Sequence, residues 1–338
     1  MHRLNTSGLS WDVFSARAVE AMSEAVPADV WCVATADPAT LMMTGITGSH
    51  IDDDASRFFE LEYGADDFLL QADLARAAPH VGALNLATHG RPQRSVRWRE
   101  LFEPFGLGDQ LRGALVSPTG CWGFFSLARA AGEKNFSASE VASIASLLRT
   151  FADGLRLAVV GDKARAPIVP TDPVLLVLDG DLAVVEVSEA AENVFERSIQ
   201  IGSPPPMEVL APATRAKLAT EGYGRGPFVT TSIRRSGKWL RTQAVPLGSG
   251  ATSRIAIIVE HARPDEVAEL MLQANGLTRR EAEVTRRVLM GLSTDEIARR
   301  LGLSPLTVQQ HLKSVFSKMD VASRRELIAG LFFPNLKG

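Results

Sequence analysis

The sequence has few cysteines and no long apolar run. Cys32 and Cys121 are its only cysteines, too few for a disulfide framework or a four-cysteine zinc site. No apolar run reaches the roughly 20 residues that a membrane-spanning helix needs, and no apolar signal-peptide core follows the first five residues. We therefore expect a reduced, cytoplasmic protein without a membrane partner. At roughly 100–200 residues per domain, 338 residues predict two or three domains.

The sequence also lacks the motifs of common catalytic and metal sites. The glycine-rich segment 222–226 has neither the Lys-Ser/Thr ending of a phosphate-binding loop nor the spacing of a dinucleotide loop. None of the six histidines pairs with another at a metal-ligand spacing. No Ser/His/Asp set, Cys/His pair or carboxylate pair stands out. We therefore predict that the protein is not an enzyme, with no catalytic residue and no metal site, and we identify no cofactor.

Charge is divided unevenly along the chain, although the net charge is only −3. Residues 277–338 contain eleven basic and six acidic residues, a net charge of +5, whereas residues 1–276 contain 25 basic and 33 acidic residues, a net charge of −8. A small basic end on an acidic body is typical of a nucleic-acid module attached to a regulatory region. Chance clustering of charge is the alternative. If the acidic body lay over the basic end, it would inhibit DNA binding in two ways. It would cover the basic end, and its negative charge would neutralise the positive charge there.

The last sixty residues carry four helix-start signals. Capping boxes are predicted at Thr278–Glu281, Ser293–Glu296 and Ser323–Glu326, where a hydroxyl and a carboxylate satisfy the first free N–H groups. A fourth helix begins at Ser304, with Pro305 at its first position. The short helix before Ser304, the turn and the helix after it form a helix-turn-helix unit.

The helix after Ser304 is predicted to have an apolar and a polar face. The inward positions are Val308, Leu312, Val315, Phe316 and Met319. The opposite positions are Gln309, Gln310, Lys313, Ser314 and Ser317. Glutamine can bond adenine, and lysine can reach guanine or phosphate. The polar face is therefore suited to reading DNA, although an ordinary solvated face is the alternative.

The spacing of particular residues in this segment closely resembles a known domain. The matching positions are Leu277-Thr278-x-Arg280-Glu281-x-x-Val284, Gly291-x-Ser293-x-x-x-Ile297-Ala298-x-x-Leu301, Ser304-x-x-Thr307-Val308-x-x-His311-Leu312, Lys318-Met319 and Ser323-Arg324-x-Glu326-Leu327. This register resembles the LuxR/NarL-type DNA-binding domain. The resemblance implies four helices, of which the third enters the major groove and the fourth helps to dimerise on two inverted half-sites.

The resemblance and the polar face together give candidate site residues. The predicted DNA contacts are Ser304, Thr307, Gln309, Gln310, His311, Lys313, Ser314, Lys318 and Arg324. The predicted dimer contacts are Ser323, Glu326, Leu327 and Leu331. Gln309 stands where the family usually has a basic residue, which we expect to change base preference. His311 has an alternative role as a packing residue.

Residues 1–160 are predicted to form an α+β domain. Strand pairs are expected at 30–36 with 41–47 and at 110–116 with 121–127. A long helix follows Ser137, and its apolar repeat predicts either an internal core or a partner helix. This order of elements, with segments such as Ala87-Thr88-His89-Gly90 and Gly120-Cys121-Trp122-Gly123, resembles a GAF-like sensor.

The remaining body is predicted to be a linker, a second α+β domain and a linker helix. Residues 161–173 read as the linker, 174–262 as a domain with two strands, helices and three strands, 263–276 as the linker helix, and 277–338 as the DNA-binding domain. The order in 174–262 resembles a PAS-like domain, with Ser188-Glu189 departing from the usual Asn. The fold class is therefore multidomain, with two α+β sensory domains and an all-α four-helix helix-turn-helix domain.

Aromatic and cysteine side chains give a candidate effector pocket in the first domain. We expect Trp31, Cys121, Trp122 and Phe124 to line it, with core packing as the alternative role. Buried, unreactive thiols are the alternative to a redox role for Cys32 and Cys121. The sequence predicts a signal-responsive transcriptional regulator whose partner is double-stranded DNA. A second copy of the chain, RNA polymerase and a small-molecule effector are further candidate partners. The alternative is a helix-turn-helix domain that binds a protein.

Overall fold

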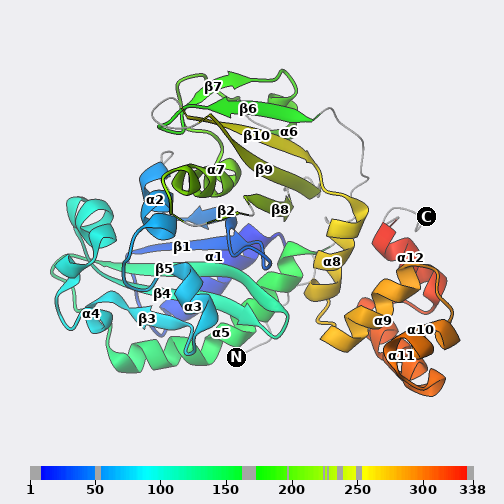
Figure 1. Cartoon of the computed structure of the whole chain (residues 1–338). Helices are drawn as coiled ribbons and strands as arrows, with labels where there is room; N and C mark the ends of the chain where they lie inside the picture. Colours follow the sequence, from blue (N-terminus) through cyan, green and yellow to red (C-terminus); the bar gives the residue numbers. More distant parts are fainter. Residues whose placement is uncertain are drawn as a thin grey trace.

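The computed structural model describes residues 9–49, 55–161, 173–195, 198–223, 225–226, 228–233, 239–248 and 253–332. It places a sheet-rich region beside a group of C-terminal helices (Figure 1). Within the described residues, no helix is both long and apolar enough to cross a membrane. The predicted linker at 161–173 lies almost entirely outside the described residues.

The first sheet is antiparallel and contains the two strand pairs that the sequence predicts. Its strand order is β2 (Met43–Gly48), β1 (Val30–Ala36), β5 (Gly120–Ala130), β4 (Leu107–Ser117) and β3 (Val81–Ala83). β4 and β5 form a long hairpin, with Ser117 opposite Gly120 at its turn. The predicted strands are therefore confirmed. The hairpin is longer than expected, because β4 begins at Leu107 and β5 ends at Ala130.

Helices cover both faces of this sheet. One face packs on α1 (Trp11–Ser23) and α5 (Ala138–Val159), and segments that include α2 (Ser56–Gly64) and α3 (Gln71–Arg76) lie over the other. The shorter elements of this region are α4 (Leu84–Ala87), η1 (Pro92–Arg94), η2 (Trp98–Phe102) and η3 (Glu103–Phe105).

The long helix α5 packs its apolar repeat inside the molecule. It begins with the predicted capping box of Ser137 and Glu140. Ile144, Leu148 and Leu155 are buried against the first sheet and α1. The interpretation of this repeat as an internal core is therefore confirmed.

The second sheet has the predicted order of two strands, helices and three strands. It consists of β7 (Val184–Val187), β6 (Val174–Leu178), β10 (Arg254–His261), β9 (Trp239–Leu247) and β8 (Val229–Ile233), all antiparallel. Its helices are α6 (Ala191–Phe195) and α7 (Met207–Thr220). No motif in the sequence marks α7, which contains an internal proline, Pro212.

The two sheets share one hydrophobic core. A single cluster of buried side chains joins Met43 and Phe124 of the first sheet to Leu176 of the second, through α7. β2 and β8 lie side by side (Figure 1), and the Asp37 carboxylate accepts from Thr231 N at 2.9 Å. The second sheet and α7 therefore complete the core of the first sheet. The division of the body into two sensory domains stays a prediction.

The C-terminal helices pack around a core of their own. They are α9 (Arg279–Leu289), α10 (Thr294–Leu301), α11 (Pro305–Met319) and α12 (Arg324–Phe332). The preceding helix, α8 (Pro264–Ala274), belongs to both regions. Ala268 and Leu272 pack into the C-terminal core, whereas Val267 and Leu270 pack with Trp239 on the second sheet. The predicted linker helix is therefore a packed connection between the body and the C-terminal domain.

Candidate functional site

The predicted caps start the C-terminal helices. Thr278 and Ser293 each complete a capping box with the glutamate three residues later. The Ser304 hydroxyl accepts from Thr307 N at 3.1 Å, and Pro305 occupies the first turn of α11. Gly302 ends α10 with a φ of +63°, a left-handed conformation that a side chain would strain. These signals set the length of the turn between α10 and α11.

The apolar back of α11 fixes the helix in the domain. Val308, Leu312 and Val315 are buried among side chains of α9 and α10, as the helical spacing predicts. Phe316 and Met319 are partly buried against the same core. Because one side of the helix is fixed, the opposite side has a defined orientation.

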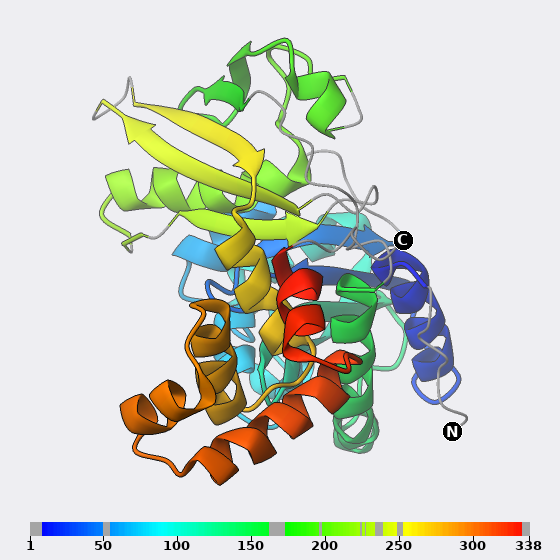
Figure 2. The same cartoon turned by 90° about the vertical axis from the view of Figure 1, so that its right-hand side faces the viewer.

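The outward face of α11 carries exposed polar side chains. Gln309, Gln310, Lys313 and Ser317 are exposed, and none has a hydrogen-bond or ion-pair partner among the described residues. α11 lies away from both sheets (Figure 2). The acidic body therefore does not cover this face in the structure, contrary to the inhibitory arrangement considered from the charge division.

Ser314 and Lys318 are bound to other groups of the domain instead of being free on the outward face. The Ser314 hydroxyl donates to Glu281 Oε1 at 2.6 Å, and Lys318 Nζ donates to Glu281 Oε2 at 2.6 Å and to the Gly276 carbonyl at 3.1 Å. Both side chains hold α11 against the start of α9. The assignment of Ser314 to the outward polar face was wrong, because its hydroxyl points to a carboxylate of the neighbouring helix.

Burial and hydrogen bonding act in opposite directions on Glu281. Burial raises the pKa of this carboxyl, but hydrogen bonds from Lys318, Ser314 and Thr278 outweigh it and hold the pKa at about 2. The charged form is therefore present at neutral pH, where it links the N-terminus of α9 to the C-terminal half of α11.

The remaining predicted DNA contacts lie at the edges of the free face. Ser304 is exposed at the start of α11, where its hydroxyl lies 2.8 Å from that of the half-buried Thr307. His311 is half-buried, which fits its alternative role in packing. The Arg324 guanidinium donates to the Leu292 carbonyl and so ties the start of α12 to the turn before α10.

Two of the four predicted dimer contacts are inside the domain. Leu327 and Leu331 are buried in the C-terminal core, and α12 packs on α8 of the same chain. The expectation that both leucines contact a partner is therefore wrong for this conformation. Ser323 and Glu326 lie half-buried at the start of α12, where the Ser323 hydroxyl accepts from Glu326 N at 3.2 Å.

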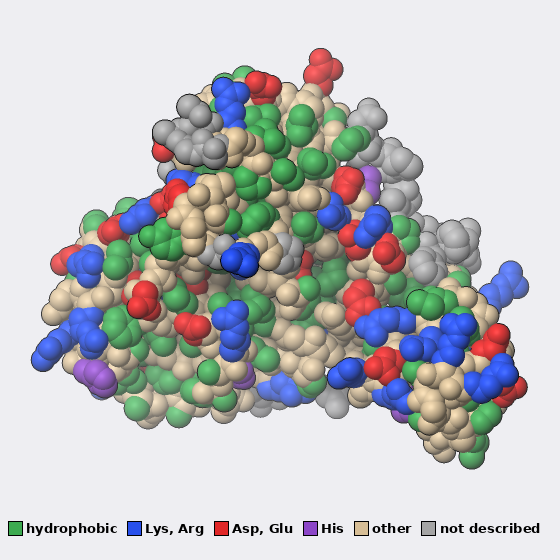
Figure 3. All heavy atoms as spheres, viewed as in Figure 1, with side chains coloured by type: hydrophobic (Ala, Val, Ile, Leu, Met, Phe, Trp, Pro, Cys, Tyr) green, Lys and Arg blue, Asp and Glu red, His purple; other side chains and the backbone are tan. Residues whose placement is uncertain are grey.

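Part of the positive charge of this domain is free and part is compensated. Arg286 forms a two-hydrogen-bond pair with Glu269, with distances of 2.6 and 2.8 Å. The exposed cations without a hydrogen-bond or ion-pair partner in the described part of the domain are Arg299, Arg300, Lys313 and Arg325. Figure 3 shows basic side chains gathered on the visible side of the C-terminal helices. The free cations are therefore available to phosphate.

Only one of the four side chains predicted to line an effector pocket lines the cavity found in this region. The structure has a cavity of about 520 Å³ on one face of the first sheet, and Phe124 lines it together with Cys32. Trp31 belongs to the opposite face, because successive strand residues point to opposite sides. Cys121 and Trp122 are buried elsewhere in the body and do not line this cavity.

Burial governs the protonation of the two thiols. Burial raises the pKa of Cys32 to about 11 and that of Cys121 to about 12, so both stay protonated at neutral pH. Among the described residues, no group of three or more His, Cys, Asp or Glu side chains could hold a metal ion.

Comparisons with known proteins match the C-terminal helices. Residues 275–330 match the family model described as bacterial regulatory proteins, luxR family. A Mycobacterium bovis protein described as an HTH-type transcriptional regulator is 50% identical over 52 residues, which cover 15% of this chain and 6% of that protein. Escherichia coli UhpA, a transcriptional regulatory protein, is 39% identical over 56 residues, 17% of this chain and 29% of UhpA. The chain therefore covers less than a third of either relative.

The comparison with solved structures is weaker. A crystal structure of Escherichia coli SdiA aligns over 96% of this chain and 91% of its own. The two chains share 12% identity, and the TM-score is 0.35. The family match, the four capped helices and the helix-turn-helix geometry agree on one region. The C-terminal region of this chain is a LuxR-family helix-turn-helix domain.

Proposed function

We propose that this chain is a sequence-specific, DNA-binding transcriptional regulator that acts in the cytoplasm. The observation that carries the proposal is the outward face of α11, where Gln309, Gln310 and Lys313 are exposed and have no partner among the described residues. A polar face of this kind on the second helix of a helix-turn-helix unit fits the major groove of B-DNA. The match to the luxR family supports the same role.

Readout of sequence is assigned to α11 and positioning to the surrounding cations. Gln309 and Gln310 bond base edges, with adenine the base that glutamine matches best, while Lys313 reaches guanine acceptors or phosphate. Arg299, Arg300 and Arg325 contact phosphates, which hold the domain in register without reading sequence. Ser304 and Thr307, at the N-terminus of α11, add phosphate contacts. Ser314, Lys318 and Arg324 support the reading helix through hydrogen bonds within the domain.

We assign the homodimer contact to the outward side of α12. Ser323 and Glu326 lie at its start and remain candidates, whereas Leu327 and Leu331 stabilise the core of each copy. Two copies would place two α11 helices on inverted half-sites. RNA polymerase is a further candidate partner of the dimer.

We assign a sensory role to the body, with a GAF-like region over residues 1–160 and a PAS-like region over 174–262. Support comes from α8, which packs on both the body and the C-terminal core. A change in the body can therefore reach the DNA-binding helices through a packed helix. The Arg156 guanidinium on α5 also donates to the Ala274 carbonyl at the end of α8.

Replacement of Lys313 tests the assigned reading face. Lys313→Ala is expected to weaken binding to a duplex that carries the recognised sequence by about 1–3 kcal/mol if the side chain bonds a base. Such a duplex is obtained by selection from a random library. If the side chain contacts phosphate, the slope of log K against log salt should lose about 0.9 of a unit. The measurement is fluorescence anisotropy at several salt concentrations. Lys134→Ala, which removes an exposed lysine from the body, is the matched control and should change neither quantity. Unaltered affinity, selectivity and slope in Lys313→Ala would contradict the assignment.

A further inference from the structure

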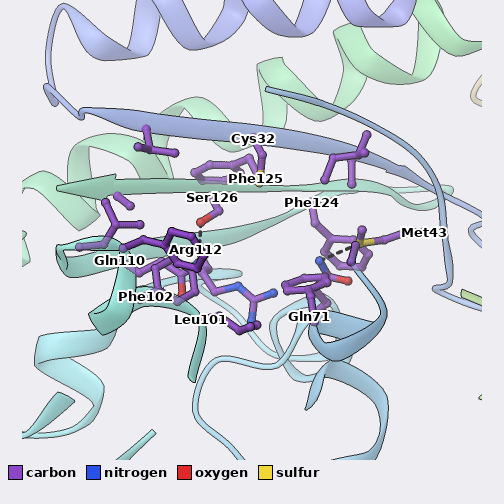
Figure 4. Close-up of a pocket in the computed structure, with 18 of the residues that line it drawn as sticks. Cys32, Met43, Gln71, Leu101, Phe102, Gln110, Arg112, Phe124, Phe125 and Ser126 are labelled. Carbon is purple, nitrogen blue, oxygen red and sulfur yellow. Dashed lines mark hydrogen bonds between the residues drawn. The ribbon is translucent and has the colours of Figure 1, made fainter. Parts of the chain in front are cut away.

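The cavity on one face of the first sheet has the size of a small-molecule site. Its volume of about 520 Å³ lies within the roughly 300–1,000 Å³ that such sites occupy. The strand face of β1, β5 and β4 forms one wall (Figure 4). Phe58 of α2, Phe102 of η2 and Met207 of α7 contribute to the rest of the lining.

The space arises from small side chains on one face of the sheet. Alternate residues of β1 and β5 face the cavity, and four of them are small: Cys32, Ala34, Ser126 and Ala128. The opposite face carries larger side chains such as Leu111 and Leu127, which pack closely with α1 and α5. The lining is therefore mainly apolar, and it leaves room that the protein does not fill.

Two buried amide oxygens in this lining have no hydrogen-bond partner. Gln71 is 6% exposed and Gln110 is 2% exposed, and the Oε1 atom of each is unpaired. Their nitrogens are used: Gln110 Nε2 donates to Ser126 Oγ at 2.6 Å, and Gln71 Nε2 contacts the Met43 sulfur at 3.2 Å. A buried acceptor without a donor costs about 1–3 kcal/mol. A bound molecule with two donors would remove that cost.

The charges beside the cavity compensate one another. Arg112, which lines the cavity, donates to Glu62 Oε2 at 2.7 Å and to the Leu69 carbonyl at 2.8 Å. The neighbouring Arg97 lies 4.0 Å from Glu62 and 3.8 Å from Asp67. Two guanidinium groups thus meet two carboxylates. A charged ligand would be desolvated here without gaining an unpaired counter-ion.

We propose that this cavity binds a neutral, mainly apolar small molecule whose two hydrogen-bond donors reach Gln71 and Gln110. Its action as a signal rests on the proposed sensory role of the body, but its binding does not. Binding and DNA recognition are therefore measured separately, so that failure of one leaves the other standing.

Isothermal titration calorimetry on the full chain tests the ligand class with four probes of one chain length. They are 1,8-octanediol, 1,8-dimethoxyoctane, octanoate and octylammonium. The diol has both donors, the dimethoxy compound has none, and the other two are charged. The diol is expected to bind at least about tenfold more tightly than each of the others, since two net hydrogen bonds are worth roughly this factor or more. Equal affinity for the diol and its dimethoxy analogue, or tighter binding of a charged probe, would overturn the proposal.

Variants of the full chain place the binding in the cavity. Gln110→Leu and Gln71→Leu should each lower diol affinity at least about threefold and bring the diol closer to the dimethoxy analogue. Gln93→Leu, the same substitution at an exposed position outside the cavity, should bind the diol as the wild type does. Ala128→Phe fills the space and should abolish binding while an unaltered circular dichroism spectrum reports the fold. Wild-type diol affinity in a folded Ala128→Phe protein, or no saturable binding of any probe to the wild type, would contradict the inference.

Discussion

Glu281→Gln is expected to destabilise the C-terminal domain by about 3 kcal/mol at neutral pH and to weaken DNA binding with it. Glu281 is 5% exposed and accepts from Thr278 N at 2.7 Å, Ser314 Oγ at 2.6 Å and Lys318 Nζ at 2.6 Å. Glutamine has nearly the same size, but its neutral amide cannot serve all three donors. The start of α9 and the position of α11 should loosen together.

The role of Glu281 also predicts how the stability of the wild-type C-terminal domain changes with pH. The pKa of Glu281 is about 2 in the folded chain, below its ordinary value of 4.5, because hydrogen bonds from Lys318, Ser314 and Thr278 outweigh the effect of burial. Its stabilising contribution is therefore complete above about pH 4.5 and is lost as the pH falls toward 2. Native-state hydrogen exchange at the amides of α9 and α11 measures this local stability in the full chain.

Glu283→Gln is the matched control, because it makes the same change two residues later on α9. Glu283 pairs with Arg280 at 2.7 Å near the surface, where water replaces a lost partner. Only a small change in the exchange of α9 and α11 is expected. Equal loss of protection in the two variants would contradict the role of Glu281.

Glu62→Gln is expected to destabilise the first sheet region by about 3–5 kcal/mol. The Glu62 carboxylate accepts from Gln71 N and from Arg112, and it lies 4.0 Å from Arg97. Arg97 is completely buried, and burial, together with repulsion from Arg112, lowers its pKa to about 9. Without the Glu62 charge, Arg112 would lose its carboxylate partner and Arg97 would keep only Asp67.

Urea unfolding measures the change in stability, and hydrogen exchange of the β4 and β5 amides shows where the loss occurs. Glu60→Gln is the control on the same helix, because the Glu60 carboxylate pairs with Arg57 and Lys217 where solvent reaches all three side chains. Its loss should cost less than about 1 kcal/mol. A Glu62→Gln protein as stable as Glu60→Gln would show that the buried charges do not depend on Glu62.

Local sequence signals predicted the helix starts and most strands, because their causes lie within a few residues. The hydroxyl of Thr278 and the carboxylate of Glu281 are three positions apart, and a capping box needs nothing else. The division of α11 into a packed side and a free side was also predictable for Val308, Gln309 and Lys313.

Features that depend on contacts between distant segments could not be read from the sequence. Ser314 lies near the polar side of α11 by spacing, but Glu281, 33 residues earlier, takes its hydroxyl. Leu327 suits a core and a dimer equally, and only the packing of α12 on the other C-terminal helices decides that it is buried. The shared core of the two sheets depends on α7, which no motif marks.

The lining of the cavity could not be predicted, for a different reason. Trp31 and Trp122 were chosen as large aromatic side chains, whereas the space lies over small ones such as Ala128. Strand alternation could have grouped Cys32, Phe124 and Ser126 on one face. It could not have shown that the helices above leave that face unfilled.

Selection of DNA from a random duplex library by the purified full chain tests the central claim most directly. The account predicts enrichment of one sequence with two inverted half-sites by the wild type, and loss of that enrichment in the double variant Gln309→Ala, Gln310→Ala. The double variant should still bind DNA non-specifically, because the phosphate contacts remain. No enriched sequence for the wild type, or the same sequence selected equally by the double variant, would contradict the assignment of α11 as the reading helix.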